Sequence, residues 1–528
     1  MHNTAQIQPS IAKASSARPW YHASYIPYIP LVIPAMLFMV SLFMPPTIEI
    51  DSGIGMLALR NMLQGGAFNI LVTADPADIS RDVATFLSDW SPGQYLAPGA
   101  LVWLGMNYGP SLSLTTFLAT LVGAVGWSQV ARSFGVTPLV SFVFVFGLVS
   151  FHSGTFPFRV YHGGEILLFA AAPWALYALR WTADQSPAIS VAVSLLTAAL
   201  LFFAKLTGLI CFAANVVAIS LFHLWHHRRV TSSIAGMWAA SAISALLFLV
   251  FWPARNYALV DASWFATAIW FPMAGTALSE FFGHDLFNYL FLYSSTPIVF
   301  NRALASYVLG PLGLLLIIWV WVRLRKSRYR IMAIFLLFII AFYTTVIAAL
   351  YFWGSALSLE DRHLRYSGII FFLLFLVAID QWRAPVAKGC VLLMLAAFAA
   401  YGLISYAHGV SELSGGRYYD SLTGTSQRNV PPVVLEYLRS EMRRHSWRGP
   451  IIVLARSPEA ALALPGFRLI DADYVTGRMA GRSDKIFVVM QERELSNGRA
   501  EAVLRSFSDY EFDRWSERRM DGMVIYSQ

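Results

Sequence analysis

The sequence predicts an α-helical polytopic membrane protein of about eleven transmembrane helices, followed by a small α/β domain that faces water. Three observations predict this fold class. Hydrophobic residues make up 57% of the 528 residues and charged residues only 13%, about half the charged share of soluble domains. The apolar residues gather in tracts of the ~20 residues that cross a bilayer as a helix. After about residue 409 the composition becomes that of an ordinary soluble protein.

The chain begins with a polar segment, residues 1–26, which carries Lys13 and Arg18 ahead of the first apolar tract. No small-residue cleavage site follows that tract, so we interpret it as an uncleaved anchor and the segment before it as a cytoplasmic tail. The predicted transmembrane module covers residues 27–408. Its predicted spans are 27–46, 111–131, 137–154, 165–182, 187–204, 208–225, 232–252, 304–322, 331–353, 367–382 and 388–408.

The segment 94–108 decides the orientation of everything after it. As a helix its 15 residues would be only about 22 Å long, short of a ~30 Å hydrocarbon core. We therefore predict a re-entrant or surface helix that does not cross. The cytoplasmic loops then hold eleven Lys and Arg residues and the opposite loops six, with the basic run 323–330 inside. This distribution favours a cytoplasmic N-terminus and a C-terminal domain, residues 409–528, outside the cytoplasm.

Three outer loops follow from this topology: 47–110, 253–303 and 354–366. Within the first, apolar residues from Gly53 to Leu63 recur at helical spacing, which predicts an amphipathic helix along the membrane surface. In the C-terminal domain, the runs 451–455, 467–470 and 485–490 are predicted strands. The segments 457–464 and 498–507 are predicted helices, and this alternation indicates an α/β domain.

Two groups of ionisable residues in these outer loops could carry chemistry. Glu49 and Asp51 directly follow the first span, where a carboxylate could act as a general base towards a hydroxyl group. The alternative is that both are solvated loop charges. The second group includes Glu360, Arg362, His363 and Arg365, whose guanidinium groups suit the oxygens of a lipid phosphate at headgroup depth. A charged, solvated surface is the alternative here as well.

A third group, with the members Arg159, Tyr161, His162 and Glu165, lies in the motif FPFRVYHGGE of the second outer turn. Donor binding and anchoring at the membrane interface are both consistent with these side chains. The sequence has no zinc-type ligand spacing, no phosphate-binding loop and no dinucleotide-binding glycine motif, so we assign no metal residues and leave the cofactor unknown. No basic run is interleaved with stacking aromatic residues, which argues against a nucleic acid partner.

The order of motifs in the first hundred residues resembles the GT-C superfamily of polyprenyl-phosphate-sugar-dependent glycosyltransferases, such as protein O-mannosyltransferases and aminoarabinose transferases. A first span precedes an acidic motif, then the helix DSGIGMLALRNMLQGG, then the aromatic–proline motif WSPGQYLAPGALVWLG. The resemblance covers residues 27–135 and is architectural up to 408. It implies that Asp51 is the catalytic carboxylate and Glu49 its partner. This chain departs from the commonest pattern, because its two acidic residues are spaced rather than adjacent.

The resemblance implies an enzyme that moves a sugar, with inversion, from a polyprenyl-phosphate donor to an acceptor hydroxyl on the outer face of a membrane. It also implies the bacterial inner membrane as the location, with a glycan, lipid or protein as acceptor. The alternatives are a transporter or flippase of lipid-linked saccharides and a saccharide ligase or polymerase. For a transporter, Lys205 is the main charge within an apolar stretch, and its side chain could snorkel to a boundary.

Overall fold

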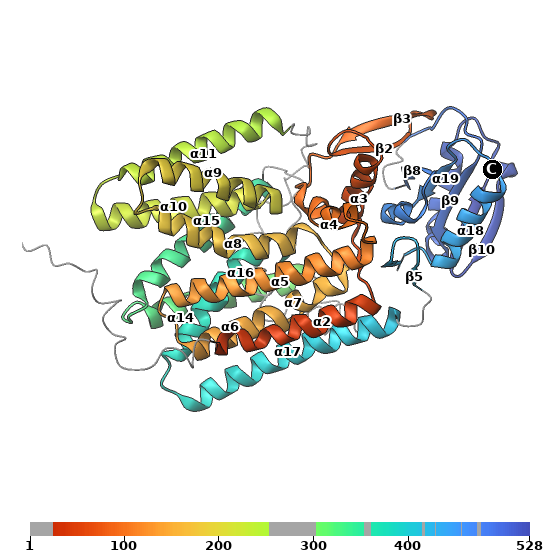
Figure 1. The fold of residues 1–528 in the computed structure, drawn as a ribbon. Helices are drawn as coiled ribbons and strands as arrows, with labels where there is room; N and C mark the ends of the chain where they lie inside the picture. The colour runs from red at the N-terminus through yellow and green to blue at the C-terminus, as the bar shows by residue number, and fades with distance from the viewer. Residues whose placement is uncertain are drawn as a thin grey trace, which may run out of the picture.

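The computed structural model describes residues 25–252, 302–352, 361–413, 418–427, 429–455, 457–472 and 477–528. Long helices lie side by side on one side of the molecule, and the C-terminal domain lies on the other (Figure 1). Between them lie the short helices and the hairpin of the first outer loop. The predicted tail 1–26 and the predicted loop 253–303 fall almost entirely outside the described residues.

Every predicted span coincides with a helix. In chain order the helices are η1 (Ile26–Leu31) with α2 (Val32–Phe43), α5 (Tyr108–Ser133), α6 (Pro138–Ser150), α8 (Gly164–Thr182), α9 (Pro187–Ala204), α10 (Gly208–His227), α11 (Ser232–Phe251), α14 (Arg302–Leu324), α15 (Arg330–Phe352), α16 (Asp361–Asp380) and α17 (Pro385–Leu413). Within the described residues, eight helices are long and apolar enough to cross a bilayer, or nine when a bent pair counts as one. The chain is an integral membrane protein.

The bent pair is α6 and the segment after it. The short helix α7 (His152–Thr155) and the 3-10 turn η2 (Phe156–Phe158) follow α6 at an angle of 62°. The predicted span 137–154 therefore does not continue as one helix past Ser150. The bend brings the chain into the short strand β4 (Val160–Tyr161), which begins the region of the candidate site.

Helix α16 corrects a second prediction. The segment 354–366 was expected to be a charged outer loop, but Arg362, His363 and Arg365 lie in the first two turns of α16. Glu360 lies outside the described residues. His363 and Arg365 are more than nine-tenths buried. A run of charges indicates a loop only when the charges face water, whereas these side chains face the interior of the bundle and contact other helices.

Helix α3 (Ile50–Leu63) is the predicted helix of the first outer loop, and it starts three residues earlier than expected. The prediction of a helix with one apolar face along the membrane surface is wrong for its first half. All eight residues from Ser52 to Leu59 are buried. Helix α3 packs against α4 (Gly93–Trp103), the strand β2 (Ile70–Asp75) and the 3-10 helix η4 (Pro458–Ala463) of the C-terminal domain. Protein therefore covers the polar side of α3 that the sequence pattern assigns to water.

Helix α4 occupies the segment on which the predicted topology depends. It has 11 residues and is about 16 Å long, roughly half the thickness of a bilayer core. The strand β2 and its partner β3 (Asp78–Phe86) form an antiparallel hairpin that the sequence analysis did not identify. The short length of α4 and the burial of its residues Tyr95 and Gly99 agree with the expectation of a helix that does not cross the bilayer.

The C-terminal domain contains a five-stranded sheet with the order β10-β11-β9-β7-β8. Strands β7 (Ile451–Leu454), β8 (Arg468–Asp471) and β9 (Ile486–Gln491) are parallel and match the three predicted strands, while β10 (Ser516–Met520) and β11 (Met523–Ser527) add an antiparallel edge. The helices are α18 (Pro432–Arg444) and α19 (Arg499–Ser506), with short turns at η4, η6 (Glu492–Asn497) and η7 (Phe512–Arg514). The predicted helix 457–464 is therefore the 3-10 helix η4, and α18 was missed.

The C-terminal domain is attached to the segment 47–110 by specific contacts. Arg60 of α3 donates to the carbonyl oxygen of Ala461 at 2.6 Å, and Arg468 pairs with Asp82 of the hairpin at 2.6 Å. A methyl group at Gly53 would come within 2.3 Å of the Cβ atom of Glu459. Glycine thus allows η4 to approach α3 at backbone distance.

Candidate functional site

A short parallel pairing brings two predicted outer segments together. Strand β1 (Thr47–Ile48) pairs with β4, so that Thr47 lies opposite Val160 and Ile48 opposite Tyr161. The N–H of Glu49 continues the pairing by donating to the carbonyl oxygen of Tyr161 at 3.2 Å. The acidic motif after α2 therefore lies beside the VYHGGE motif that opens α8.

The start of α3 fixes the two predicted carboxylates. Glu49 is the N-cap of the helix, and its Oε2 atom accepts a hydrogen bond of 2.8 Å from the N–H of Asp51. Asp51 follows in the first turn, where the positive end of the helix dipole stabilises a negative charge. The helix start therefore holds both acidic side chains in place, two residues apart.

Arg362 joins the two main groups of predicted site residues. Its Nη2 atom lies 3.2 Å from Oδ2 of Asp51, and its Nε atom lies 3.8 Å from Oε1 of Glu165. Glu165 in turn pairs with Lys205, whose Nζ atom is 2.7 Å away. The result is a chain of alternating charges, Asp51–Arg362–Glu165–Lys205, contributed by α3, α16, α8 and the turn between α9 and α10.

This four-charge chain is partly buried and is electrically neutral. The side chain of Glu165 is 9% exposed and that of Lys205 13%, against 30% for Asp51. Removing such charges from water costs free energy that only mutual pairing offsets. An anion that enters from the exposed end would meet Arg362 first and would compete with Asp51 for it.

The sequence pattern placed Glu165 in the third group, without a role of its own and without a partner. Lys205 was not assigned to the site, because it was interpreted as a snorkelling side chain. The available signal was a lone lysine within an apolar tract, because such a charge must face the bundle interior and find a partner. Only the packing of α8 against α9 and α10 identifies that partner.

The remaining predicted site residues are placed differently from one another. His363 is buried, and its Nδ1 atom has no hydrogen-bond partner within the described residues. Arg365 donates to the carbonyl oxygen of Ser153 at 2.6 Å and covers the ring of Phe169. Its guanidinium group is therefore committed to the α7 and α8 region. The structure does not bring these two side chains into one open cluster with Arg362.

Arg159 and His162 separate across β4. Arg159 donates to the carbonyl oxygen of Ser405 at 3.5 Å and packs on the ring of Phe156, so it faces α17. His162 lies on the other side, where it lines a cavity together with Glu49. Of the two residues, only His162 is placed to meet a ligand at the carboxylates.

The cavity beside Glu49 has a volume of about 680 Å³. Module residues line one side and C-terminal domain residues the other, including Glu459, Gln427 and Asn429. Burial raises the pKa of Glu49 to about 7, and the negative charge of Asp51 adds to this, while Arg362 opposes it. Burial likewise raises the pKa of Glu459 to about 8.

These two raised pKa values make the stability of the protein depend on pH. In the unfolded chain both carboxyl groups lose their protons near pH 4.5, but in the folded protein near 7 and 8. The folded state therefore holds more protons in this window, and its stability falls as pH rises from about 5 to 8. We expect the thermal unfolding midpoint of purified protein to fall over this range, and Glu459→Gln to flatten the upper part of the profile.

The pH response of a third carboxyl group serves as an internal reference. Burial raises the pKa of Asp471 in β8 to about 6, and this group responds at lower pH in both proteins. A midpoint that does not change between pH 6 and 8.5, or the same slope in wild type and Glu459→Gln, would contradict the expectation.

Within the described residues, no three His, Cys, Asp or Glu side chains come together as metal ligands.

Among the comparisons with known proteins, matches come from the solved structures. No family model matches the chain, and no curated protein matches it. ArnT from Cupriavidus metallidurans bound to undecaprenyl phosphate is 14% identical, with a TM-score of 0.47 over 95% of this chain and 97% of that one. AglB from Archaeoglobus fulgidus, an archaeal oligosaccharyltransferase in complex with an inhibitory peptide and a dolichol-phosphate, is 10% identical, with a TM-score of 0.47 over 95% and 74%.

The arabinofuranosyltransferase AftD from Mycobacteria is 16% identical, with a TM-score of 0.44. The match covers 85% of this chain and 33% of AftD.

Proposed function

We propose that this protein is a membrane glycosyltransferase of the GT-C type, which moves a sugar from a polyprenyl-phosphate donor to an acceptor hydroxyl. One observation carries the proposal: the 3.2 Å contact between Arg362 and Asp51. The two residues are 311 positions apart in the chain, and the resemblance in the acidic motif concerns only the first of them. This contact supports the proposal, because Asp51 is the candidate base and Arg362 a candidate phosphate ligand.

The four-charge chain supports a sequence of events in which donor binding activates the base. The phosphodiester monoanion of the donor binds Arg362 and Lys205, because guanidinium and ammonium groups both bind phosphate oxygens. Arg362 then pairs less closely with Asp51, and the carboxylate of Asp51 is left available to an acceptor hydroxyl. Donor binding and base activation are thereby coupled through one side chain.

The chemical step is a displacement at the anomeric carbon. The carboxylate of Asp51 takes the proton of the acceptor hydroxyl, and the hydroxyl oxygen forms a bond to the anomeric carbon. The bond between that carbon and the phosphate oxygen breaks, and its electron pair leaves with the polyprenyl phosphate. Arg362 and Lys205 stabilise the negative charge that develops on the phosphate. One displacement inverts the anomeric centre.

The location belongs to the same proposal. We place the N-terminus in the cytoplasm and the C-terminal domain on the outer face of a bacterial inner membrane. Support comes from the distribution of Lys and Arg residues over the loops and from α4, whose 11 residues are too few to cross. The acceptor is a glycan, a lipid or a protein.

The test supplies purified protein with radiolabelled polyprenyl-phosphate sugars, one at a time, together with a membrane extract as the source of acceptor. We expect one donor to be consumed and its label to appear on a product other than free sugar. Label that changes leaflet in vesicles without forming a product would support a flippase instead. Consumption of diphosphate-linked saccharides alone would support a ligase or polymerase.

A further inference from the structure

The proposed reaction assigns no role to the 680 Å³ cavity beside Glu49. It begins at Glu49, whose side chain is hydrogen-bonded to the backbone of Asp51, and it extends between β1 and the C-terminal domain. Asp51 does not line it. The cavity is thus adjacent to the candidate base but separate from the buried charges that would hold a phosphate.

The side chains around the cavity include several uncharged hydrogen-bonding groups. Three amides, Gln427, Asn429 and Gln491, come from the C-terminal domain, and Phe156 and Met523 add apolar surface. Among the described lining residues Arg493 is the one arginine or lysine. Amides with both donors and acceptors suit hydroxyl groups, and a ring face suits the C–H surface of a sugar. A phosphorylated ligand would call for clustered cations, which this lining lacks.

Glu459 is the least satisfied of these groups. Its side chain is 5% exposed, Oε1 accepts from Asn429 Nδ2 at 3.2 Å, and Oε2 has no hydrogen-bond partner within the described residues. Burial raises the pKa of Glu459 to about 8, so the carboxyl group keeps a proton at neutral pH. A buried polar atom without a partner is costly, and a neutral carboxylic acid can both donate to and accept from a ligand hydroxyl.

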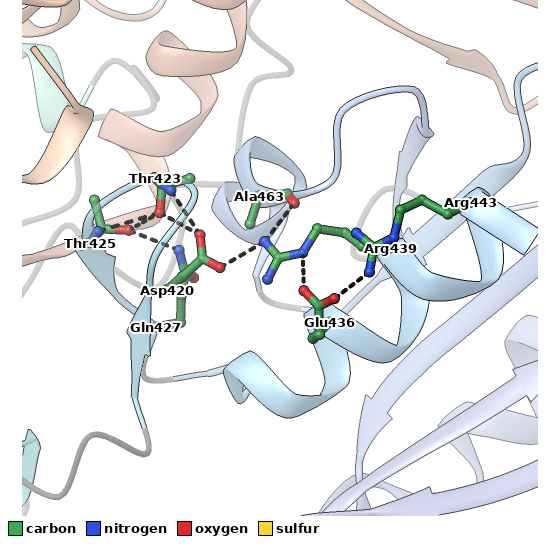
Figure 2. Close-up of polar contacts among 8 residues, drawn as sticks. All are labelled: Asp420, Thr423, Thr425, Gln427, Glu436, Arg439, Arg443 and Ala463. Carbon is green, nitrogen blue, oxygen red and sulfur yellow. Dashed lines mark hydrogen bonds and ion pairs between the residues drawn. The ribbon is translucent and has the colours of Figure 1, made fainter.

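The wall of the cavity is held rigidly. Asp420 is fully buried and pairs with Arg439 at 2.7 Å, while it also accepts from the N–H and hydroxyl of Thr423 (Figure 2). In the same network, Gln427 donates to Thr425 Oγ1 at 3.0 Å. Ser426 donates to the carbonyl oxygen of Pro45, at the end of the first span, at 2.7 Å. The network fixes Gln427 relative to the module before any ligand binds.

We infer that this cavity is the acceptor subsite and that it binds a neutral, polyhydroxylated group, a sugar ring, with Oε2 of Glu459 and the amide of Gln427 as ligands. The inference rests on the proposed function and deepens it, because it names the chemical class of the acceptor. It also gives the C-terminal domain a part in acceptor selection. The hydroxyl that reacts then projects past Glu49 towards Asp51.

Direct binding tests the inference without any transfer reaction. Full-length protein in lipid nanodiscs is titrated with the methyl α-glycosides of glucose, galactose and mannose, and with glucose 6-phosphate, and binding is followed by saturation-transfer difference NMR. We expect at least one neutral glycoside to bind and the phosphate ester to bind more weakly. Glu459→Leu should weaken the neutral glycoside about tenfold, the loss of one good hydrogen bond.

Three further variants separate recognition from folding. Glu459→Gln keeps the size and a hydrogen bond, so it should stay within about threefold of wild type. Gln427→Ala should weaken binding about tenfold even if Glu459→Leu does not fold. Glu501→Leu is the matched control, because Glu501 lies exposed on α19 and pairs with Arg505 on the same helix. It should bind as wild type does.

Several results would overturn the inference: no neutral glycoside binding to folded wild type, equal binding in wild type and Gln427→Ala, or tighter binding of glucose 6-phosphate. These outcomes are distinguishable from failure of the proposed function. A protein that binds glycosides at this cavity but consumes no lipid-phosphate sugar would keep the subsite and reject the transferase. A protein that transfers sugar to a non-saccharide product but binds no glycoside would keep the transferase and reject the subsite.

Discussion

Asp51→Asn should lower sugar transfer by about 10²–10⁴-fold, the usual contribution of a general base. An asparagine amide has nearly the same shape and can still lie at the start of α3, but it cannot take a proton from the acceptor hydroxyl. The loss should appear in kcat rather than in the affinity for the donor, because the phosphate ligands remain. The measurement is initial-rate transfer with a saturating labelled donor, on protein of matched size-exclusion profile.

The control for this variant is Asp184→Asn. Asp184 lies after α8, at the opposite end of that helix from Glu165, and its side chain is 80% exposed. We expect its activity to stay within about twofold of wild type, as for surface substitutions away from a site. Transfer at the wild-type rate in folded Asp51→Asn would remove Asp51 from the role of base. Glu49, which lines the cavity and has a pKa of about 7, would then be the next candidate.

Lys205→Met should destabilise the protein by about 3 kcal/mol. Breaking a buried ion pair by removing one partner leaves an uncompensated buried charge, which typically costs ~3–5 kcal/mol. Here the stranded group is Glu165, 9% exposed. Arg362 remains 3.8 Å away and keeps the cost near the lower end of that range. The measurement is the temperature at which half of the detergent-solubilised protein survives heating as a monodisperse peak.

A double variant separates charge from packing. Glu165→Gln with Lys205→Met removes both charges of the pair, so we expect it to recover most of the stability that Lys205→Met loses. Both variants should lose transfer, since Lys205 is a proposed phosphate ligand. Equal stability of Lys205→Met and wild type would mean that Lys205 is solvated rather than paired. If the double variant is no more stable than Lys205→Met, the loss comes from poor packing of the methionine side chain at position 205.

The C-terminal domain shows where sequence patterns are most reliable. Strands β7, β8 and β9 were predicted to within about a residue. Strands β7 and β9 are apolar runs that are buried along almost their whole length, and β8 has two buried apolar residues, Leu469 and Ile470, at its centre. Strand β10 was missed, since Ser516–Met520 is polar and largely exposed. The hairpin β2–β3 was missed as well, because five of the nine residues of β3 are exposed and neither strand shows a clean alternation of burial.

The predicted site residues divide along similar lines. Asp51 and Arg362 were chosen separately, one for its place after a span and the other for its basic neighbours, and the structure puts them in contact. Arg365 and Arg159 were chosen on the same grounds, yet both are committed to backbone carbonyls elsewhere. Residue type identifies which groups could bind a phosphate, but the direction of each side chain depends on which helix face is buried.

The sequence by itself determined the membrane-spanning character, the order of the helices and the parallel strands of the C-terminal domain. These follow from local hydrophobicity and its period, which a single stretch of chain contains. Only the tertiary structure decided that Glu165 and Lys205 complete a chain of charges with Asp51 and Arg362, and that Glu459 shares a cavity with Glu49. Such contacts join residues hundreds of positions apart, and no local pattern records them, because they arise when helices and domains pack.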